Sequence, residues 1–232
     1  MTVASLSVVV PALNEEMNLE ATIKSIQETA PLFFEEWEIL IFNDGSTDAT
    51  GKIADRLARS ESRIRVFHHA KPINIGGCYK EGIQRAKNQY LIMIPGDNEC
   101  GAEVMKRVFS RAGTADMIIP YTSNHEVRPW GRRVLSKLFV WWINRVGGHN
   151  LHYYNGAVLH RTELLRSIPI RTDGFGYQAE ILLKLLSKGH SYNEVGIEIT
   201  YRPFGSSKAI SPSSLIRMGR FLFQLTFQRN FA

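Results

Sequence analysis

Residues 90–99, with the sequence YLIMIPGDNE, join an apolar run to a charged turn. The run is apolar without a break until Pro95 and Gly96 end it, which is typical of a strand covered on both faces of a parallel sheet. Asp97 and Glu99 then place two carboxylates directly after the strand. The segment predicts a strand end that is either a polar turn or a site for a metal and a phosphate.

Similar apolar runs recur through the first 120 residues, at 6–11, 38–43, 63–68 and 116–120. Between them, apolar residues repeat every three or four positions, as Leu19, Ile23 and Ile26 do, which predicts amphipathic helices. This alternation predicts an α/β fold of βαβ units, with a mainly parallel central sheet flanked by helices.

The second half of the chain has a more mixed pattern. It predicts helices over 129–146 and 177–189, and strands over 154–161 and 193–203. A final basic, amphipathic helix is predicted over 213–229.

The composition is that of an ordinary globular protein with a mild basic excess. The 232 residues include 28 Lys and Arg against 22 Asp and Glu, a net charge of +6. This excess favours anionic partners such as nucleotides or lipid phosphates, and we expect no nucleic-acid partner. The two cysteines, Cys78 and Cys100, form no CxxC, which favours a reducing compartment. We expect no signal peptide and no transmembrane helix, so membrane contact would come from the surface.

Polar residues follow three of the predicted strands, at Asn14 and Glu15, at Asn43 and Asp44, and at Asp97 and Glu99. Each group could simply turn the chain or cap a helix. Ligands of open parallel sheets bind beyond the carboxyl ends of the strands, however, and three such ends together favour a ligand site. The sequence has no GxGxxG after the first strand and no P-loop, which argues against those two nucleotide-binding modes.

The residue types at these ends suit a phosphate ligand with a metal. Asp97 and Glu99 are hard oxygen ligands for Mg²⁺ or Mn²⁺. Glu15, Asn43 and Asp44 could hydrogen-bond a ribose or a base edge. Gly96 would let a phosphate or a sugar approach the backbone.

A family resemblance rests on several motifs that occur in order along the chain. The segments VVVPALNEEMNLEATIKSI, EILIFNDGSTDATGKIA and YLIMIPGDNE resemble the N-terminal half of family 2 glycosyltransferases, which have the GT-A (Rossmann-like) fold. The segment GFGYQAEILLKLLSKGHSYNEVGIEITYRPFGSSK resembles the dolichyl-phosphate mannosyltransferase branch and its bacterial polyprenyl-phosphate relatives. The resemblance implies an inverting, metal-dependent hexosyltransferase that moves a sugar from a nucleoside-diphosphate sugar to a polyprenyl phosphate, with Mg²⁺ or Mn²⁺.

The resemblance also implies roles for individual residues. The nucleotide-sugar pocket would comprise Pro11, Leu13, Glu15, Ile41, Asn43, Asp44, Gly96 and Asp97. Asp97 would anchor the metal with help from Glu99. The catalytic set would be Asp97 with Arg202 and Lys208, whose positive charges would stabilise the leaving diphosphate. Arg132 and Ser136 would hold the acceptor phosphate.

The resemblance divides the chain into a glycosyltransferase domain, residues 1–210, and a C-terminal amphipathic helix, residues 211–232. Within the domain, the nucleotide-binding half spans about 1–120 and the acceptor half about 121–210. The Arg-, Lys- and Trp-rich helix over 129–146 suits a membrane interface, which predicts a peripheral protein at the cytoplasmic membrane face. Packing of this helix in the core or in a homodimer is the alternative.

Three departures from the family pattern leave the donor sugar open. Pro95 stands where the first acid of the metal motif is usual, and Asn43 stands where an Asp is usual. Residues 152–158 read HYYNGAV, without the usual Phe-Arg.

The acceptor class also has alternatives. A phosphate acceptor needs no general base, whereas a hydroxyl acceptor usually needs a carboxylate. Gln178 and Glu180 follow the lipid-phosphate branch, although Glu180 could instead be the structural partner of a buried basic group. A transferase acting on a hydroxyl, and an inactive nucleotide-sugar-binding protein, therefore remain the rival hypotheses. His68 and His69, after the third strand, are interpreted as structural.

Overall fold

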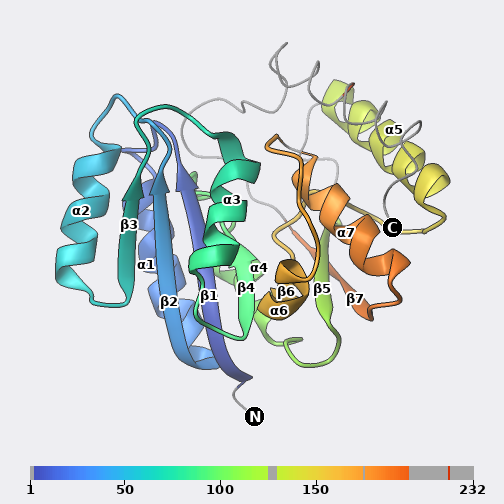
Figure 1. Ribbon diagram of the computed structural model, residues 1–232, viewed down its shortest axis with the longest axis horizontal. Helices are drawn as coiled ribbons and strands as arrows, with labels where there is room; N and C mark the ends of the chain where they lie inside the picture. Colours follow the sequence, from blue (N-terminus) through green and yellow to red (C-terminus); the bar gives the residue numbers. More distant parts are fainter. Residues whose placement is uncertain (1–2, 125–129, 175, 199–218, 220–232) are drawn as a thin grey trace.

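A seven-stranded sheet with helices on both faces forms this protein (Figure 1). The computed structural model describes residues 3–124, 130–174, 176–198 and 219. The strands are β1 (Val3–Ala12), β2 (Phe34–Asn43), β3 (Ile64–His68), β4 (Tyr90–Met93), β5 (Met117–Thr122), β6 (Leu159–Arg161) and β7 (Tyr192–Ile197). The helices are α1 (Leu19–Thr29), the 3₁₀ turn η1 (Ala30–Leu32), α2 (Thr50–Ser60), α3 (Asn74–Arg85), α4 (Ala102–Phe109), α5 (Trp130–Gly147), α6 (Thr162–Arg166) and α7 (Tyr177–Ser187).

The strand order is β3-β2-β1-β4-β6-β5-β7, and β6 runs antiparallel to both of its neighbours, β4 and β5. The other paired strands are parallel, which confirms the predicted α/β architecture. Because β1, β2 and β4 are parallel neighbours, their carboxyl ends meet at one edge. Ala12 pairs with Asn43, and the Gly96 N–H donates to the carbonyl of Pro11 at 3.0 Å.

Two apolar layers cover the two faces of the sheet. On one face, α1, α2 and α4 pack over β1 side chains such as Val8 and Val10. On the other face, α3, α5, α6 and α7 cover Val9 and its neighbours. Successive strand residues point to opposite faces, so the unbroken apolar runs are buried on both sides. Both layers contain residues from before and after position 120, so the two predicted halves share one sheet and both apolar layers.

The five strands predicted in the first 120 residues are all present, and α5 and α7 match the predicted helices 129–146 and 177–189. The strand predicted over 154–161 is shorter than expected, because only Leu159–Arg161 pairs with neighbouring strands. The preceding loop packs closely on β5: a Cβ at Gly156 would lie 2.6 Å from the Pro120 carbonyl oxygen. The helix predicted over 213–229 and the boundary at 210/211 lie outside the described residues, except for Gly219.

Candidate active site

The loops after β1 and β2 are hydrogen-bonded into one wall of the candidate site. Asn14, with a φ of 56°, receives the N–H of Thr47 on its Oδ1 at 2.9 Å and donates its own N–H to Ser46 Oγ. The Glu15 N–H donates to Thr50 Oγ1 at 2.8 Å. The loops after β1 and β2 are thus hydrogen-bonded to one another at the carboxyl ends of these strands.

Two of the predicted pocket residues on β1 and β2 are part of the core. Ile41 is fully buried among the residues that pack against α1, and Pro11 is buried at the end of β1. Leu13 and Glu15 are half-buried on the loop that follows. The Glu15 carboxylate accepts a hydrogen bond from Asn18 Nδ2 at 2.8 Å, which fixes its direction. Of these four, Leu13 and Glu15 are therefore the ones whose side chains reach the loop surface.

Asn43 is the first link of a hydrogen-bonded chain. Its Nδ2 lies 2.9 Å from His68 Nδ1, and His68 Nε2 lies 3.0 Å from the Asp55 carboxylate. A neutral His68 with its proton on Nε2 satisfies both contacts, because Nδ1 then accepts from the amide. Gly51 leaves room for this amide, since a Cβ there would lie 2.8 Å from Asn43 Nδ2.

Asp44 is buried and holds the start of α3. One carboxylate oxygen accepts the N–H of Ile73 at 2.8 Å, and the other accepts the N–H of Asn74 at 3.0 Å. The first oxygen also lies 2.8 Å from His69 Nδ1. The turn-and-cap interpretation of a strand-end acid thus accounts for Asp44.

The loop after β4 places Asp97 beside the end of β1. Asp97 Oδ1 accepts the Glu99 N–H at 3.1 Å, and Asn98 between them has a φ of 58°. Asp97 and Glu99 are both half-buried. A Cβ at Gly96 would lie 3.2 Å from the Ala12 Cβ, so the space beside this glycine is filled by the protein itself. Gly96 lets the loop pack closely on β1.

The predicted acceptor and diphosphate residues are described only in part. Ser136 is half-buried on α5. Arg132 lies on the same helix, one turn earlier, and its side chain is outside the described residues. Arg202 and Lys208 also lie outside the described residues, so their roles stay predictions.

Glu180 is a structural partner of a buried lysine. Its carboxylate accepts hydrogen bonds from Lys184 Nζ at 2.7 Å and from the N–H groups of Arg171 and Thr172 at 3.0 and 2.8 Å. Burial alone raises the pKa of this carboxyl, but the hydrogen bonds from Lys184 and Thr172 outweigh it and hold the pKa below its ordinary value. Glu180 is therefore ionised and hydrogen-bonded, as expected if it is the structural partner of a buried basic group.

A backbone contact joins α3 to the loop before α7. The Gly76 N–H donates to the Asp173 carbonyl at 2.8 Å, and a Cβ at Gly76 would lie 2.6 Å from the Thr172 carbonyl oxygen. Lys80 adds an ion pair with Asp173. Sequence reasoning missed this contact, and it also missed that His68 and His69 bind the strand-end pair Asn43–Asp44. The sequence indicated the role of these histidines only through their position at the end of the strand that pairs with β2.

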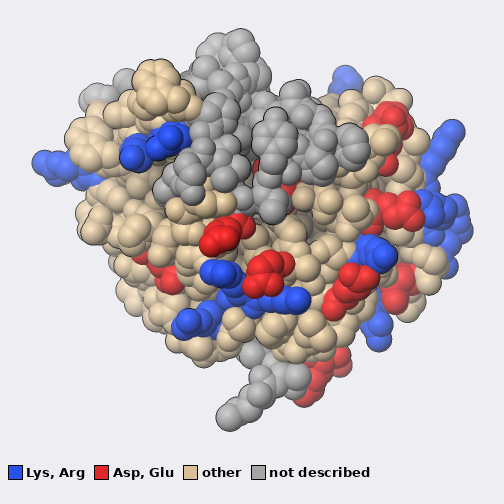
Figure 2. Space-filling view, turned by 180° about the vertical axis from the view of Figure 1, so that it is seen from behind, with Lys and Arg blue, Asp and Glu red and all other residues tan. Residues whose placement is uncertain are grey.

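The outer face of α5 is apolar and basic. Exposed large apolar side chains on it are Trp130, Val134, Leu135, Leu138, Trp141, Trp142 and Val146. Helix α5 contains basic but no acidic residues, and Figure 2 shows basic side chains beside apolar ones at this end of the molecule. The inner face packs in the core through Phe139 and Ile143. The membrane and core hypotheses for this helix thus apply to different faces of it. None of the helices among the described residues has the length and apolar character needed to cross a bilayer.

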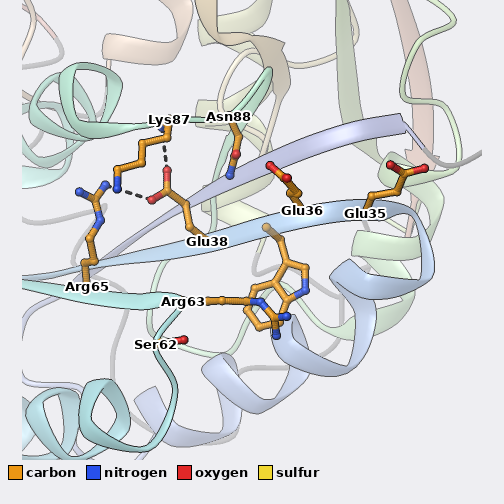
Figure 3. A pocket seen from close by; sticks show the side chains of 9 residues that line it. Glu35, Glu36, Glu38, Ser62, Arg63, Arg65, Lys87 and Asn88 are labelled. Carbon is orange, nitrogen blue, oxygen red and sulfur yellow. Dashed lines mark hydrogen bonds and ion pairs between the residues drawn. The ribbon is translucent and has the colours of Figure 1, made fainter.

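A hollow at the opposite edge of the sheet has a different character (Figure 3). It lies at the amino ends of β2 and β3, and its central carboxylate belongs to Glu38. This carboxylate already accepts hydrogen bonds from the Arg65 guanidinium at 3.0 Å and from the Lys87 N–H at 2.7 Å. The hollow is therefore separate from the candidate site at the carboxyl ends of the strands.

Comparisons with known sequences assign the chain to a family. The model of glycosyl transferase family 2 matches residues 7–167. The chain is 29% identical over 214 residues to polyprenol monophosphomannose synthase of Mycolicibacterium smegmatis, covering 87% of this chain and 79% of that one. It is 26% identical over 216 residues to undecaprenyl-phosphate mannosyltransferase of Micrococcus luteus, covering 86% and 85%.

Solved structures with the same fold hold a nucleotide and a metal. Glucosyl-3-phosphoglycerate synthase from Mycobacterium tuberculosis in complex with Mn²⁺, UDP-glucose and phosphoglyceric acid has a TM-score of 0.71 at 19% identity, covering 97% of this chain and 79% of that one. The same enzyme with Mg²⁺ and UDP has a TM-score of 0.70 at 20% identity, with the same coverage. These similarities confirm the predicted GT-A fold. Taken with the family match, they identify the chain as a glycosyltransferase that belongs to glycosyl transferase family 2.

Proposed function

We propose that this glycosyltransferase moves a sugar, with inversion, from a nucleoside-diphosphate sugar to a polyprenyl phosphate at the cytoplasmic face of a membrane. The exposed face of α5 carries the lipid part of this proposal. The names of the two relatives, each matched over most of its length, support the acceptor class. We further propose that residues 1–210 form the catalytic domain and residues 211–232 a C-terminal amphipathic helix.

The face of α5 suits a lipid surface rather than water. Trp130 is 78% exposed, and Leu138 and Trp141 are each 58% exposed. Burying such apolar area at the headgroup boundary is favourable, and tryptophan is a common residue of helices that lie in this boundary. The helix contains four basic residues and no acidic residue, so it would be attracted to anionic lipids. The alternative is that this face contacts a second copy of the chain in a homodimer.

The state of Glu180 agrees with an acceptor that is already anionic. A hydroxyl must lose a proton during transfer, so a free carboxylate is expected near it. Glu180 is 3% exposed and its oxygens already receive three N–H donors. A phosphate monoester carries its own negative charge and needs no such base. We propose that Arg132 and Ser136 hold this phosphate.

At the donor side, Asp97 and Glu99 fit a hard divalent cation. They offer carboxylate oxygens, the ligands that Mg²⁺ and Mn²⁺ prefer, and the remaining ligands would come from the donor diphosphate and water. The cation, when bound, supplies positive charge to the diphosphate as it leaves. We propose that Arg202 and Lys208 add to this charge stabilisation. Leu13, Glu15 and Asn43 would contact the nucleoside.

The decisive experiment offers the purified chain several acceptors. Vesicles with polyprenyl phosphate, vesicles without it, and soluble saccharide acceptors are each incubated with a panel of nucleotide sugars and Mn²⁺. Sugar transfer only to the polyprenyl phosphate supports the proposal. Transfer to a saccharide hydroxyl supports the first rival hypothesis. Nucleoside diphosphate binding without any turnover supports the inactive, nucleotide-sugar-binding alternative.

A further inference from the structure

A mixed group of side chains lies next to the loops that form the wall of the candidate site. Asp44 follows β2, His69 follows β3, and Cys78 belongs to α3. One donor atom from each of the three lies within 4.8 Å of the other two. Asp44 is 4% exposed, Cys78 is fully buried, and the His69 side chain is 13% exposed. Within the described ranges, this is the one group of three or more such residues close enough to hold a metal.

His69 faces a carboxylate on each side. Its Nδ1 lies 2.8 Å from Asp44 Oδ1, and its Nε2 lies 3.0 Å from Glu81 Oε2. A neutral imidazole has one N–H and can donate to only one of these oxygens. The other nitrogen would then direct a lone pair at a carboxylate. A second positive centre on one of the ring nitrogens, such as a metal ion, would satisfy both contacts.

We propose that Asp44, His69 and Cys78 form a binding site for a borderline-soft metal ion such as Zn²⁺, separate from the Mg²⁺ or Mn²⁺ position proposed at Asp97. His69 would bind through Nδ1, Cys78 through its sulfur and Asp44 through one oxygen, with a fourth position left for water. Nε2–H of His69 would keep its contact with Glu81, the outer carboxylate partner that metal-bound histidines commonly have.

The ligand set decides which ions would bind. A thiolate favours Zn²⁺, Co²⁺ or Cd²⁺ and disfavours Mg²⁺ and Mn²⁺. Burial, together with the nearby charges of Asp44 and Glu81, raises the pKa of the Cys78 thiol, so the thiol is protonated when no metal is bound. The same negative charges attract a cation. Binding would release the thiol proton, and the Nδ1 proton of His69 where present, to solvent.

The location gives the metal a structural consequence. Asp44 also accepts the N–H groups of Ile73 and Asn74. An ion on Asp44 would therefore connect the end of β2, the end of β3 and the start of α3. A metal that binds only the folded chain stabilises it, so the melting temperature should rise.

Cobalt alone is the probe for this site, added to the full-length chain in the absence of donor and acceptor. A Co²⁺ ion bound to a thiolate gives a near-ultraviolet charge-transfer absorption. The chain provides a matched control because its other cysteine, Cys100, lies beside the proposed Mg²⁺ or Mn²⁺ position. We expect the absorption in the wild type and in Cys100→Ala, its loss in Cys78→Ala, and its displacement by Zn²⁺. We also expect His69→Gln to weaken Co²⁺ binding at least 10-fold, since it removes one of three protein ligands.

The outcomes separate this site from the transferase activity. Circular dichroism establishes that each variant is folded, and Cys78→Ser replaces Cys78→Ala if the alanine variant is not. No cobalt–thiolate absorption in the wild type would overturn the proposal, and so would an absorption lost in Cys100→Ala but kept in Cys78→Ala. A Zn²⁺-dependent rise in melting temperature that survives in the Cys78 variant would also count against it. None of these readouts depends on sugar transfer.

Discussion

The side-chain amide of Asn43 lies 2.9 Å from Nδ1 of His68, and Nε2 of His68 lies 3.0 Å from the carboxylate of Asp55. The amide can donate to a neutral imidazole, which then donates to the acid. The family resemblance makes Asp usual at position 43. In this chain the histidine on the neighbouring strand end gives the amide a specific partner.

Replacing Asn43 with Asp should therefore destabilise the protein, although Asp is the residue that relatives commonly have. At pH 8 a carboxylate would face the lone pair of Nδ1, and we expect a loss of about 1–3 kcal/mol in the free energy of unfolding. Urea unfolding of the single variants and of the double variant with His68→Ala measures the coupling. An equal cost with and without His68 would contradict this account.

His160 should make stability fall in mild acid. It is fully buried between Tyr79 and Gln178, and burial lowers its pKa to about 3. The folded protein thus keeps His160 neutral, while the unfolded chain takes up a proton below about pH 6.5. The stability is fully present above that pH and is lost as the pH falls towards 3, at a rate of up to about 1.4 kcal/mol per pH unit.

Thermal unfolding of the wild type and of His160→Gln between pH 7 and pH 5 measures this contribution. The variant should lose less stability over the same range, because glutamine does not titrate. Parallel curves for the two proteins would show that His160 is not the group responsible.

Asp97 should be essential for transfer. Asp97→Ala removes the proposed metal anchor, and we expect the rate to fall at least about 100-fold while the fold is retained. Glu99→Gln should cost about 10-fold and raise the Mn²⁺ concentration needed for half-maximal rate. A Glu103→Gln variant, on the exposed first turn of α4, serves as a control for loss of an acidic charge. Wild-type activity in Asp97→Ala would show that Asp97 is not the metal anchor.

Glu180 should matter for folding and not as a base. Glu180→Gln leaves the buried Lys184 charge without its carboxylate, and we expect it to cost about 3–5 kcal/mol in the free energy of unfolding. The double variant Glu180→Gln/Lys184→Met removes both charges, so most of the stability and the activity should return. A stable double variant without transferase activity would instead indicate a catalytic carboxylate.

Leucine residues on two surfaces test the membrane role of α5. Leu138 on α5 is 58% exposed and Leu32 in η1 is 61% exposed, so they form a matched pair. Leu138→Ser should lower the affinity for vesicles of anionic lipid about 5- to 10-fold, the effect of about 1–1.5 kcal/mol of apolar burial. Leu32→Ser should leave it unchanged. Equal effects of the two substitutions would exclude α5 as the membrane-binding face.

The parts of the fold that follow from local pattern were predictable from the sequence. The strands β1, β4 and β5 and the carboxyl half of β2 contain apolar runs, and such runs are buried where the sheet has helices on both faces. The strand β3, with the sequence IRVFH, is only partly buried. The short strand β6 has no such pattern, because its two-residue pairings with β4 and β5 depend on distant partners. The three polar strand ends were predicted to meet, and the register of β1 with β2 and the contact of Gly96 with Pro11 bring them together.

The interactions within the candidate site were less predictable because they join residues far apart in the chain. Asp44 binds backbone groups 29 and 30 positions later, and Asn43 binds a histidine 25 positions later. No local spacing rule indicates such partners. Glu180 and Lys184 are the exception: they are four residues apart on one helix, and the sequence already suggested a buried basic partner.

The backbone contact between Gly76 and Asp173 limits how relatives of this enzyme could be recombined. On the proposed division of the chain, an engineer who wishes to change the acceptor would exchange the C-terminal half and keep the N-terminal half, residues 1–120. Such a hybrid would need a residue without a side chain at position 76, and a loop at 172–173 that follows the same path. A hybrid that lacks this contact would have to rebuild the junction between α3 and the loop before α7, in addition to the two apolar layers that both halves share.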